Sequence, residues 1–559
     1  MKTPPIGRQD PLSPSQNPLS PSLSKAIPLS KQLLPGLLIA LAFLLINLVG
    51  LDRSPTVSID EVTLNDPAKE LARHGVLRST VFAGSERLER VERDFVATSG
   101  GFEEVYFWQP PAQPMTTAVV YKLFGFGIWQ TRVPGVLFGA GIILCVYLLG
   151  RDLFSSRVAG TIAALILAFD PPFVKIARTG RMDTECILFA LVALLLLWRW
   201  RAQSPRSTLT LAAAGLSVGL ATVTHPVGFA WVGVSVALLF LSAGLDGPHS
   251  LGKARFERAR VVRAVVPSIV FLSFAAIPGA LWLLWAAQAP RLFAAQFLQH
   301  GEKHLTEGSP LVRTWQELIR TAAAYKTTPL LLLAYVGAFF AALVVHHEPV
   351  EGQTAHPEAQ TAYPEPVEGR TSRYWVAAIA LIPFLFNAMF MTKDVGYYYL
   401  HPLVGVVLAA GGVAADLLYR LAARGMVVKT LAASMAAAVL ANAVLMGTGG
   451  RLLTIAEQWN ARDYATVAGP IRQVIPSGSI VWGPHEAWYA VDEAGSELRL
   501  LGPADPELHD FAIVRAGASP PTGFHRVADL GQPLPAVFGL FPVDSQDYRM
   551  TVLRSDRHL

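Results

Sequence analysis

The sequence predicts an all-α polytopic membrane protein with about 11 transmembrane helices and a small α/β domain at the C-terminal end. Of the 559 residues, 52% are hydrophobic and only 16% are charged, against roughly 25% charged in ordinary soluble chains. Eleven apolar runs approach the length that crosses about 30 Å of hydrocarbon. From Trp459 onward the hydrophobicity falls, and short β-like runs alternate with Gly and Pro.

Charge and cysteine content narrow the class further. The net charge is +5, from 46 basic and 41 acidic residues, and the basic residues form short clusters between apolar runs, which gives no case for nucleic acid as a partner. Cys145 and Cys186 both lie inside apolar runs, so we expect buried thiols and neither a disulfide nor a tight metal site. The sequence leaves room only for a weakly bound divalent cation as a cofactor.

The chain begins with a Pro-Leu-Ser-rich tail, residues 1–32, which cannot bury a core and is predicted to be disordered. The first apolar run, residues 33–51, lacks an A-x-A-like cleavage site, so we interpret it as a retained first span with the tail in the cytoplasm. The other runs complete a transmembrane module over 33–450 and fall near 132–150, 158–176, 185–198, 208–223, 227–244, 264–286, 329–345, 374–391, 398–418 and 430–447.

Basic residues in the short loops define the topology. They fall almost entirely on alternate loops, on the side of the N-terminal tail, as the positive-inside rule requires. The opposite side receives the loops 52–131 and 287–328 and the region 451–559. The sequence therefore predicts a multi-pass plasma-membrane protein whose reactive groups face away from the cytoplasm. An enzyme there has no nucleotide-activated donor and needs one delivered within the membrane.

Two further segments concern organisation. Glu348-Pro-Val-Glu-Gly and Glu365-Pro-Val-Glu-Gly are near-copies in a polar cytoplasmic loop, so residues 346–373 are predicted to be a disordered insertion. In the extracytoplasmic region 451–559, we expect a helix around 462–474 and strands at 479–482, 497–501, 511–515 and 548–553.

An acid pair, Asp60 and Glu61, follows the first span. The spacing from Leu64 to Leu71 predicts a short amphipathic helix that ends at Gly75. The side chains of neighbouring helical residues diverge by about 100°, so only one of the two acids can point squarely into a given site. In a purely structural interpretation, Asp60 is only the N-cap of this helix and Glu61 a first-turn acid.

A third acid, Asp183, lies between the third and fourth spans, shortly after Arg178 and Arg181. An ionised Asp at mid-bilayer costs about 2.5–3.5 kcal/mol, so Asp183 should be paired or face water. Either Arg181 and Asp183 form an ion pair that only fixes the helix ends, or the acids and guanidinium groups suit an acceptor hydroxyl and a phosphate leaving group. Lys393 is a further candidate cation for that phosphate.

Several motifs in this order resemble the GT-C glycosyltransferases. They are the Asp60-Glu61 pair, Gln109-Pro-Pro before an apolar segment too short to span, Arg132-Val-Pro134, Val146-Tyr-Leu-Leu-Gly-Arg151-Asp-Leu-Phe154, and Arg178-x-x-Arg181-x-Asp183. The branch that they resemble is that of protein O-mannosyltransferases and bacterial lipid A aminoarabinose transferases, of the glycosyltransferase family 39 type. The resemblance covers roughly residues 33–235.

The resemblance implies an inverting hexosyl- or pentosyltransferase that takes its sugar from a polyprenyl-phosphate carrier. The acceptor is a hydroxyl or phosphate of an envelope lipid, glycan or protein, on the extracytoplasmic face. Asp60 is then the general base or the acceptor-orienting carboxylate, Glu61 supports it, and Asp183 is a second acid of the site. Thr63 stands where aminoarabinose transferases have Arg, so phosphate handling must differ.

The candidates for substrate binding are Arg178, Arg181, Gln109, His225, Tyr398, His401 and Lys393. His225 stands where many relatives have Lys, although a capping or interfacial histidine is the more common explanation of such a residue. The tyrosines before His401 also fit an aromatic belt at the membrane surface.

Two other classes of function predict different sequence features. A transporter or flippase for a lipid-linked substrate would predict mid-span charges and similar halves, and the sequence shows neither. A non-catalytic scaffold or sensor that presents the C-terminal domain would leave Asp60, Glu61 and Asp183 far apart.

Overall fold

A computed structural model describes residues 29–83, 100–203, 205–245, 253–298, 309–344, 369–390, 398–422, 424–500, 502–535 and 548–558. Residues 1–28 of the predicted tail, most of the predicted insertion 346–373, and Lys393 lie outside these ranges.

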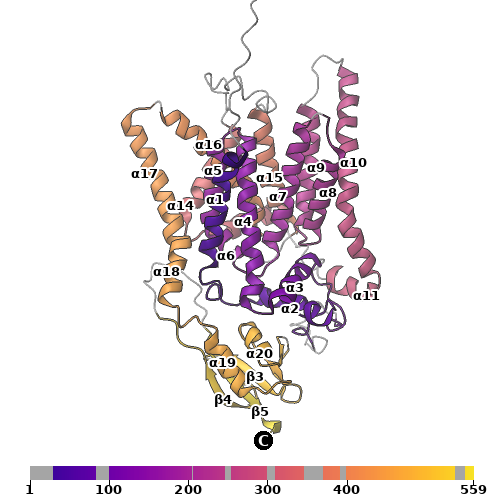
Figure 1. Cartoon of the computed structure of the whole chain (residues 1–559), viewed down its shortest axis with the longest axis vertical. Helices are drawn as coiled ribbons and strands as arrows, with labels where there is room; N and C mark the ends of the chain where they lie inside the picture. Colours follow the sequence, from indigo (N-terminus) through magenta and orange to yellow (C-terminus); the bar gives the residue numbers. More distant parts are fainter. Residues whose placement is uncertain are drawn as a thin grey trace, which may run out of the picture.

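The first half of the bundle follows the predicted apolar runs. Its helices are α1 (Leu29–Leu48), α4 (Ile128–Leu153), α5 (Arg157–Phe169), α6 (Pro171–Ala177), α7 (Asp183–Ala202), α8 (Thr208–Thr222) and α9 (Gly228–Leu245). The second half is formed by α10 (Lys253–Ala286), α14 (Pro329–Val344), α15 (Gly369–Phe390), α16 (Leu400–Ala422) and α17 (Met426–Ala443) (Figure 1). Each predicted run therefore coincides with a helix or with the pair α5 and α6.

The number of spans is smaller by strict criteria than the sequence predicts. Within the described residues, five helices are long and apolar enough to cross a membrane, or six if α5 and α6, which are bent by 66°, form one span. The helices α1, α8, α9 and α14 are apolar but shorter. The chain is a multi-pass membrane protein, and eleven spans remain a prediction.

Close helix packing in the bundle uses small residues. A Cβ atom added to Gly215 or Gly219 of α8 would come within 2.3 Å and 2.4 Å of backbone carbonyl oxygens of Phe271 and Ala275 on α10. The two helices can therefore approach each other only because these positions carry no side chain, as in other small-residue interfaces of membrane helices.

Short helices connect the longer ones. They are α2 (Ile59–His74), α3 (Ala112–Phe124), α11 (Pro290–Phe293) and α13 (Pro310–Ala324), of which α13 packs against α15. The helix α3 occupies part of the segment after Gln109-Pro-Pro that is too short to span. Figure 1 shows α2 and α3 at the end of the bundle that faces the C-terminal domain, which the chain reaches through α18 (Gly449–Glu457).

The C-terminal domain contains the predicted small sheet. Its helices are α19 (Ala465–Val474) and α20 (Trp488–Glu493), and its strands are β1 (Ile480–Trp482), β2 (Glu497–Arg499), β3 (Phe511–Arg515), β4 (Phe524–Leu530) and β5 (Met550–Ser555). The strand order is β2-β1-β3-β5-β4, with β1 parallel to β2 and β3, and β5 antiparallel to β3 and β4. The edge strand β4 is absent from the sequence prediction.

The loop after α1 and the C-terminal domain share one hydrophobic core. Val62 and Phe82 from the loop region pack in the same buried cluster as Ile471, Tyr489 and Val552 from the C-terminal domain. A separate, larger cluster fills the helical bundle. The C-terminal domain is therefore packed against the helix that carries the acid pair and is more than an appendage.

Candidate active site

The acid pair sits in the first turn of α2. Ser58 is the N-cap, since its hydroxyl accepts a hydrogen bond from the backbone N–H of Glu61 at 3.2 Å, and Gly75 ends the helix with a φ of 73°. The interpretation of Asp60 as the N-cap is therefore wrong. Carboxylates in a first helical turn are stabilised by the helix dipole, and the two side chains diverge as neighbours on a helix must.

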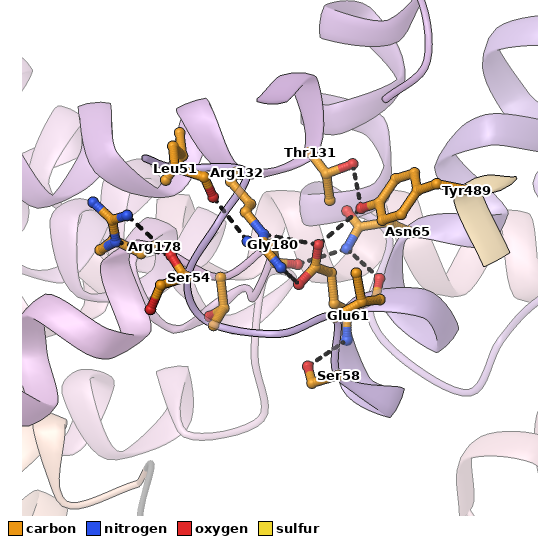
Figure 2. Close-up of polar contacts among 12 residues, drawn as sticks. Leu51, Ser54, Ser58, Glu61, Asn65, Thr131, Arg132, Arg178, Gly180 and Tyr489 are labelled. Carbon is orange, nitrogen blue, oxygen red and sulfur yellow. Dashed lines mark hydrogen bonds and ion pairs between the residues drawn. The ribbon is translucent and has the colours of Figure 1, made fainter. Parts of the chain in front are cut away.

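Glu61 points into the protein and forms a closed ion pair with Arg132 of α4. The Nε and Nη2 atoms of Arg132 donate to the two carboxylate oxygens at 3.0 Å and 2.9 Å, and neither side chain is exposed to solvent. Arg132 also donates to the carbonyl of Leu51 at 2.8 Å, and the hydroxyl of Tyr489 donates to Glu61 at 2.8 Å (Figure 2). Buried charges require such complete pairing. Because the pair and its hydrogen bonds involve α2, α4 and Tyr489, they also connect these two helices with the C-terminal domain.

Asp60 points the other way, toward Arg181. The Nη1 atom of Arg181 contacts the Asp60 carboxylate, while its Nε donates to Oδ2 of Asp183 at 2.8 Å. The Asp60 side chain is 35% exposed, whereas Asp183 is fully buried. Arg181 thus brings together two acids from distant parts of the chain, one of them open to solvent.

Asp183 is the first residue of α7, where the helix dipole favours a carboxylate. Its ion pair with Arg181 agrees with the structural interpretation of the sequence, but the same arginine also reaches Asp60. The Oδ1 atom of Asp183 is buried and has no hydrogen-bond partner among the described residues. Because Asp60 and Asp183 both contact Arg181, the structure differs from the non-catalytic scaffold, for which these acids would lie far apart.

Arg178 contacts backbone carbonyl groups rather than the acids. It is 1% exposed, and its Nε, Nη1 and Nη2 atoms all donate to backbone carbonyls, those of Asn47, Val49, Gly50 and Ser54. Figure 2 shows the contact with Ser54. These carbonyls lie at the C-terminal end of α1 and in the loop that leads to α2. Arg178 therefore holds this loop in place, and its placement argues against a role in phosphate binding.

Two histidines and a tyrosine lie beside the Arg181 cluster. The ring of His225 is centred 5.4 Å from that of Tyr398 and 5.9 Å from that of His401, and the Tyr398 side chain lies close to the charges of Arg181 and Asp183. His225 Nδ1 accepts from the backbone N–H of Val227 at 3.0 Å, as expected of a histidine that shapes a turn. The structure thus places three of the predicted substrate-binding residues together.

His401 is fixed through one side of its ring. Its Nδ1 accepts a hydrogen bond from Nε1 of Trp231 at 2.9 Å, which leaves the proton of the neutral ring on Nε2. The Nε2 atom is buried and has no hydrogen-bond partner among the described residues.

The predicted substrate-binding role of Gln109 stays a prediction, and it is Gln113, one helical turn later, that contacts the acid-bearing helix. Gln109 is half-buried just before α3, and Gln113 in the first turn of α3 is the residue that reaches α2. Its Nε2 donates to Asn65 Oδ1 at 2.8 Å, and Asn65 in turn donates to the carbonyls of Glu61 and Gly180 at 2.7 Å and 2.6 Å. This chain of amides ties α3 and the loop before α7 to the acid-bearing helix.

Sequence reasoning missed three residues of the site region. Arg132 belongs to a motif that carried the family resemblance, but its partner was not foreseen. Tyr489 comes from the C-terminal domain, for which no role was predicted. Glu185 on α7 is 2% exposed and accepts from the hydroxyl of Thr116 on α3 at 2.7 Å, and only its position close to Asp183 could have signalled it.

The described residues fit a divalent cation poorly. Among them, no group of three or more His, Cys, Asp or Glu side chains is arranged to hold a metal ion. The guanidinium of Arg181 already lies between Asp60 and Asp183, at the position where a cation would bridge two carboxylates.

Comparison with known proteins agrees with this architecture. Residues 108–253 match the model of a family described as dolichyl-phosphate-mannose-protein mannosyltransferase. The resemblance to the GT-C glycosyltransferases that the sequence predicts is confirmed.

Particular relatives extend the comparison. The fold is similar to that of ArnT from Cupriavidus metallidurans bound to undecaprenyl phosphate, with a TM-score of 0.54, 16% identity, and coverage of 94% of this chain and 98% of that chain. The apo state of the same ArnT matches with a TM-score of 0.53, 16% identity, and coverage of 92% and 97%. YkcB of Bacillus subtilis (strain 168), named as a candidate mannosyltransferase, is 32% identical over 91 residues, which is 16% of this chain and only 13% of that protein.

Proposed function

We propose that this protein transfers a sugar from a polyprenyl-phosphate carrier to an acceptor hydroxyl or phosphate on the extracytoplasmic face of the plasma membrane, with inversion. In this reaction the acceptor oxygen attacks the anomeric carbon, and the bond from that carbon to the oxygen of the carrier phosphate breaks. A hydroxyl acceptor passes its proton to a carboxylate, whereas an ionised phosphate acceptor has no proton to lose and needs the carboxylate only for orientation. A single displacement inverts the anomeric centre.

The observation that carries the proposal is the placement of Asp60. It is the partly exposed member of an otherwise buried acid–arginine cluster, at the end of a bundle whose fold is similar to that of a protein bound to undecaprenyl phosphate. A positioned carboxylate accelerates proton removal from an acceptor by roughly 10²–10⁴-fold. Asp60 is thus the general base or the acceptor-orienting group.

Arg181 is the candidate for the leaving phosphate. Displacement of a phosphate requires cations that take up the charge that develops on its oxygens. The ion pair with the buried Asp183 fixes the guanidinium at one side of Asp60. In this arrangement Asp183 orients Arg181, and Arg181 accommodates the phosphate beside the reacting carbon.

The neighbouring polar groups suit the sugar itself. Asp183 Oδ1 and His401 Nε2 are buried polar atoms without a hydrogen-bond partner among the described residues, one an acceptor and the other a donor in the neutral ring. Sugar hydroxyls can both donate and accept hydrogen bonds. We infer that His225, Tyr398 and His401 surround the donor sugar. The distribution of basic loop residues supports an extracytoplasmic site.

The test uses Asp60→Asn in the full-length protein in membranes supplied with a labelled polyprenyl-phosphate sugar. We expect transfer to fall by roughly 10²–10⁴-fold, since the variant keeps the shape of the side chain and loses its basicity. Asp52→Asn is the matched control, because Asp52 lies in the loop that leads to α2 and its side chain is also partly exposed, at 28%. Undiminished transfer by Asp60→Asn would exclude Asp60 as the base, and movement of the labelled lipid without transfer in the parent protein would indicate a transporter.

A further inference from the structure

One residue of the C-terminal domain reaches the acid pair directly. The hydroxyl of Tyr489 on α20 donates to a carboxylate oxygen of Glu61 at 2.8 Å, and the tyrosine is 1% exposed. The same hydroxyl lies 2.9 Å from Thr131 Oγ1, which is 2.6 Å from the hydroxyl of Tyr121 on α3. A buried chain of hydroxyl groups thus runs from α3 through α4 to Glu61, and the C-terminal domain supplies the member that contacts Glu61.

The ring of Tyr489 is held by packing that does not involve its hydroxyl. It stacks on Phe126 with ring centroids 5.2 Å apart and lies against Tyr464 at 6.0 Å. The hydroxyl is therefore presented to Glu61 by a fixed ring, and its bond to an ionised acceptor is of the stronger, charge-assisted kind.

The other end of α2 has a separate connection to the same helix of the C-terminal domain. Asp492 of α20 accepts from the guanidinium of Arg73 at 2.8 Å and 2.6 Å and lies 3.3 Å from the ammonium of Lys69. The helix α2 is thus attached to α20 at both ends, and only the attachment at its first turn involves the acid pair.

We propose that the C-terminal domain completes the active site, with Tyr489 as a positioning residue that fixes Glu61 and thereby the turn of α2 that carries Asp60. Tyr489 contacts no reacting atom in this proposal. It acts through Glu61 and Arg132, whose pair sets the rotation of the first turn and so the direction in which Asp60 faces. The expected change in kcat rests on the proposed function, whereas the expected change in the mobility of the first turn of α2 does not.

The test compares Tyr489→Phe with Asp492→Asn in the full-length protein. Phenylalanine keeps the ring packing and removes only the hydroxyl. We expect the kcat of Tyr489→Phe for transfer from a polyprenyl-phosphate sugar to fall about 10-fold with the donor KM changed by less than about twofold, because a lost hydrogen bond to a charged group loosens Asp60 and leaves donor contacts intact. The Asp492→Asn variant should stay within about threefold of the parent in both constants. Equal losses in the two variants would reduce Tyr489 to a docking contact and overturn the proposal.

A second measurement needs no substrate. Hydrogen–deuterium exchange of the purified parent and variants should show faster exchange at the start of α2, over the first two turns at residues 59–66, in Tyr489→Phe. In Asp492→Asn, the faster exchange should appear in the last turn, residues 69–74. Unchanged exchange of the first turn in Tyr489→Phe would overturn the proposal even if no donor sugar supports transfer. A parent without transfer but with the expected exchange pattern would contradict the proposed function alone.

Discussion

Two adjacent carboxylates on one helix have opposite surroundings. Glu61 and its partner Arg132 are both fully buried, and each carboxylate oxygen has a donor. Asp60 shares Arg181 with Asp183 and keeps 35% of its side chain exposed. The sequence alone shows two equivalent acids, so the difference comes entirely from the direction in which each side chain leaves the helix.

The comparison separates structural acids from reactive ones. A fully buried ion pair is costly to break, because removal of one partner leaves an uncompensated charge in a medium of low dielectric. An exposed pair is screened and contributes little to stability. We therefore expect the stability of the protein to depend on Glu61 and its chemistry to depend on Asp60.

The largest expected effect is on stability, in Glu61→Gln. The amide keeps the shape of the side chain but leaves the guanidinium of Arg132 buried without an anion, so we expect a loss of about 3–5 kcal/mol. Thermal unfolding of the purified protein in detergent measures it. In the same assay, Asp60→Asn should change stability by less than about 1 kcal/mol. Equal losses of stability in the two variants would remove the distinction between the pairs.

A third acid of α2, Asp66, tests whether burial of its side chain decides how much an acid contributes to the stability of the protein. Asp66 is fully buried, lies 2.9 Å from the ammonium of Lys69, and accepts from Ser79 Oγ and the backbone N–H groups of Thr80 and Val81. Burial alone would raise its pKa, but the charge of Lys69 and these hydrogen bonds lower the pKa below the ordinary value of 3.8. Asp66 should therefore behave like Glu61.

The lowered pKa of Asp66 gives a stability that depends on pH. Its contribution is complete above pH 3.8, the ordinary value, and is lost as the pH falls through the lower pKa of the folded state. Each unit of depression corresponds to about 1.4 kcal/mol. We expect the melting temperature of Asp66→Asn to fall less steeply than that of the parent below about pH 4. If the melting temperatures of the two proteins fall in parallel as the pH decreases, the buried partners of Asp66 do not lower its pKa in the folded state.

The sequence predicted the helices better than the contacts between them. Apolar runs define helices locally, and Asp60 and Asp183 could be assigned to one site because each begins a helix at the same end of the bundle. The edge strand β4 was missed because His525, Arg526 and Asp529 interrupt its apolar pattern, as is usual for strands at a sheet edge.

The partners of the acids could not be predicted, because they depend on tertiary contacts. Arg132 is 71 residues from Glu61, and Tyr489 is 428 residues from it. Arg178 and Arg181 are equally plausible ligands by residue type, and only the fold shows that one closes a loop while the other bridges two acids. Residue type thus predicts which groups are reactive, and packing decides which of them are used.

The smallest expected effect concerns Arg73→Ala. The Arg73 side chain is 44% exposed, so its bidentate pair with Asp492 is screened by solvent and salt. Asp492 keeps Lys69 as a partner at 3.3 Å when Arg73 is removed. We expect a loss of less than about 1 kcal/mol in thermal unfolding, reduced further at high salt, and transfer within about twofold of the parent. A loss as large as that of Glu61→Gln would show that attachment of the C-terminal domain, rather than burial of the individual pair, determines which charges on α2 stabilise the protein.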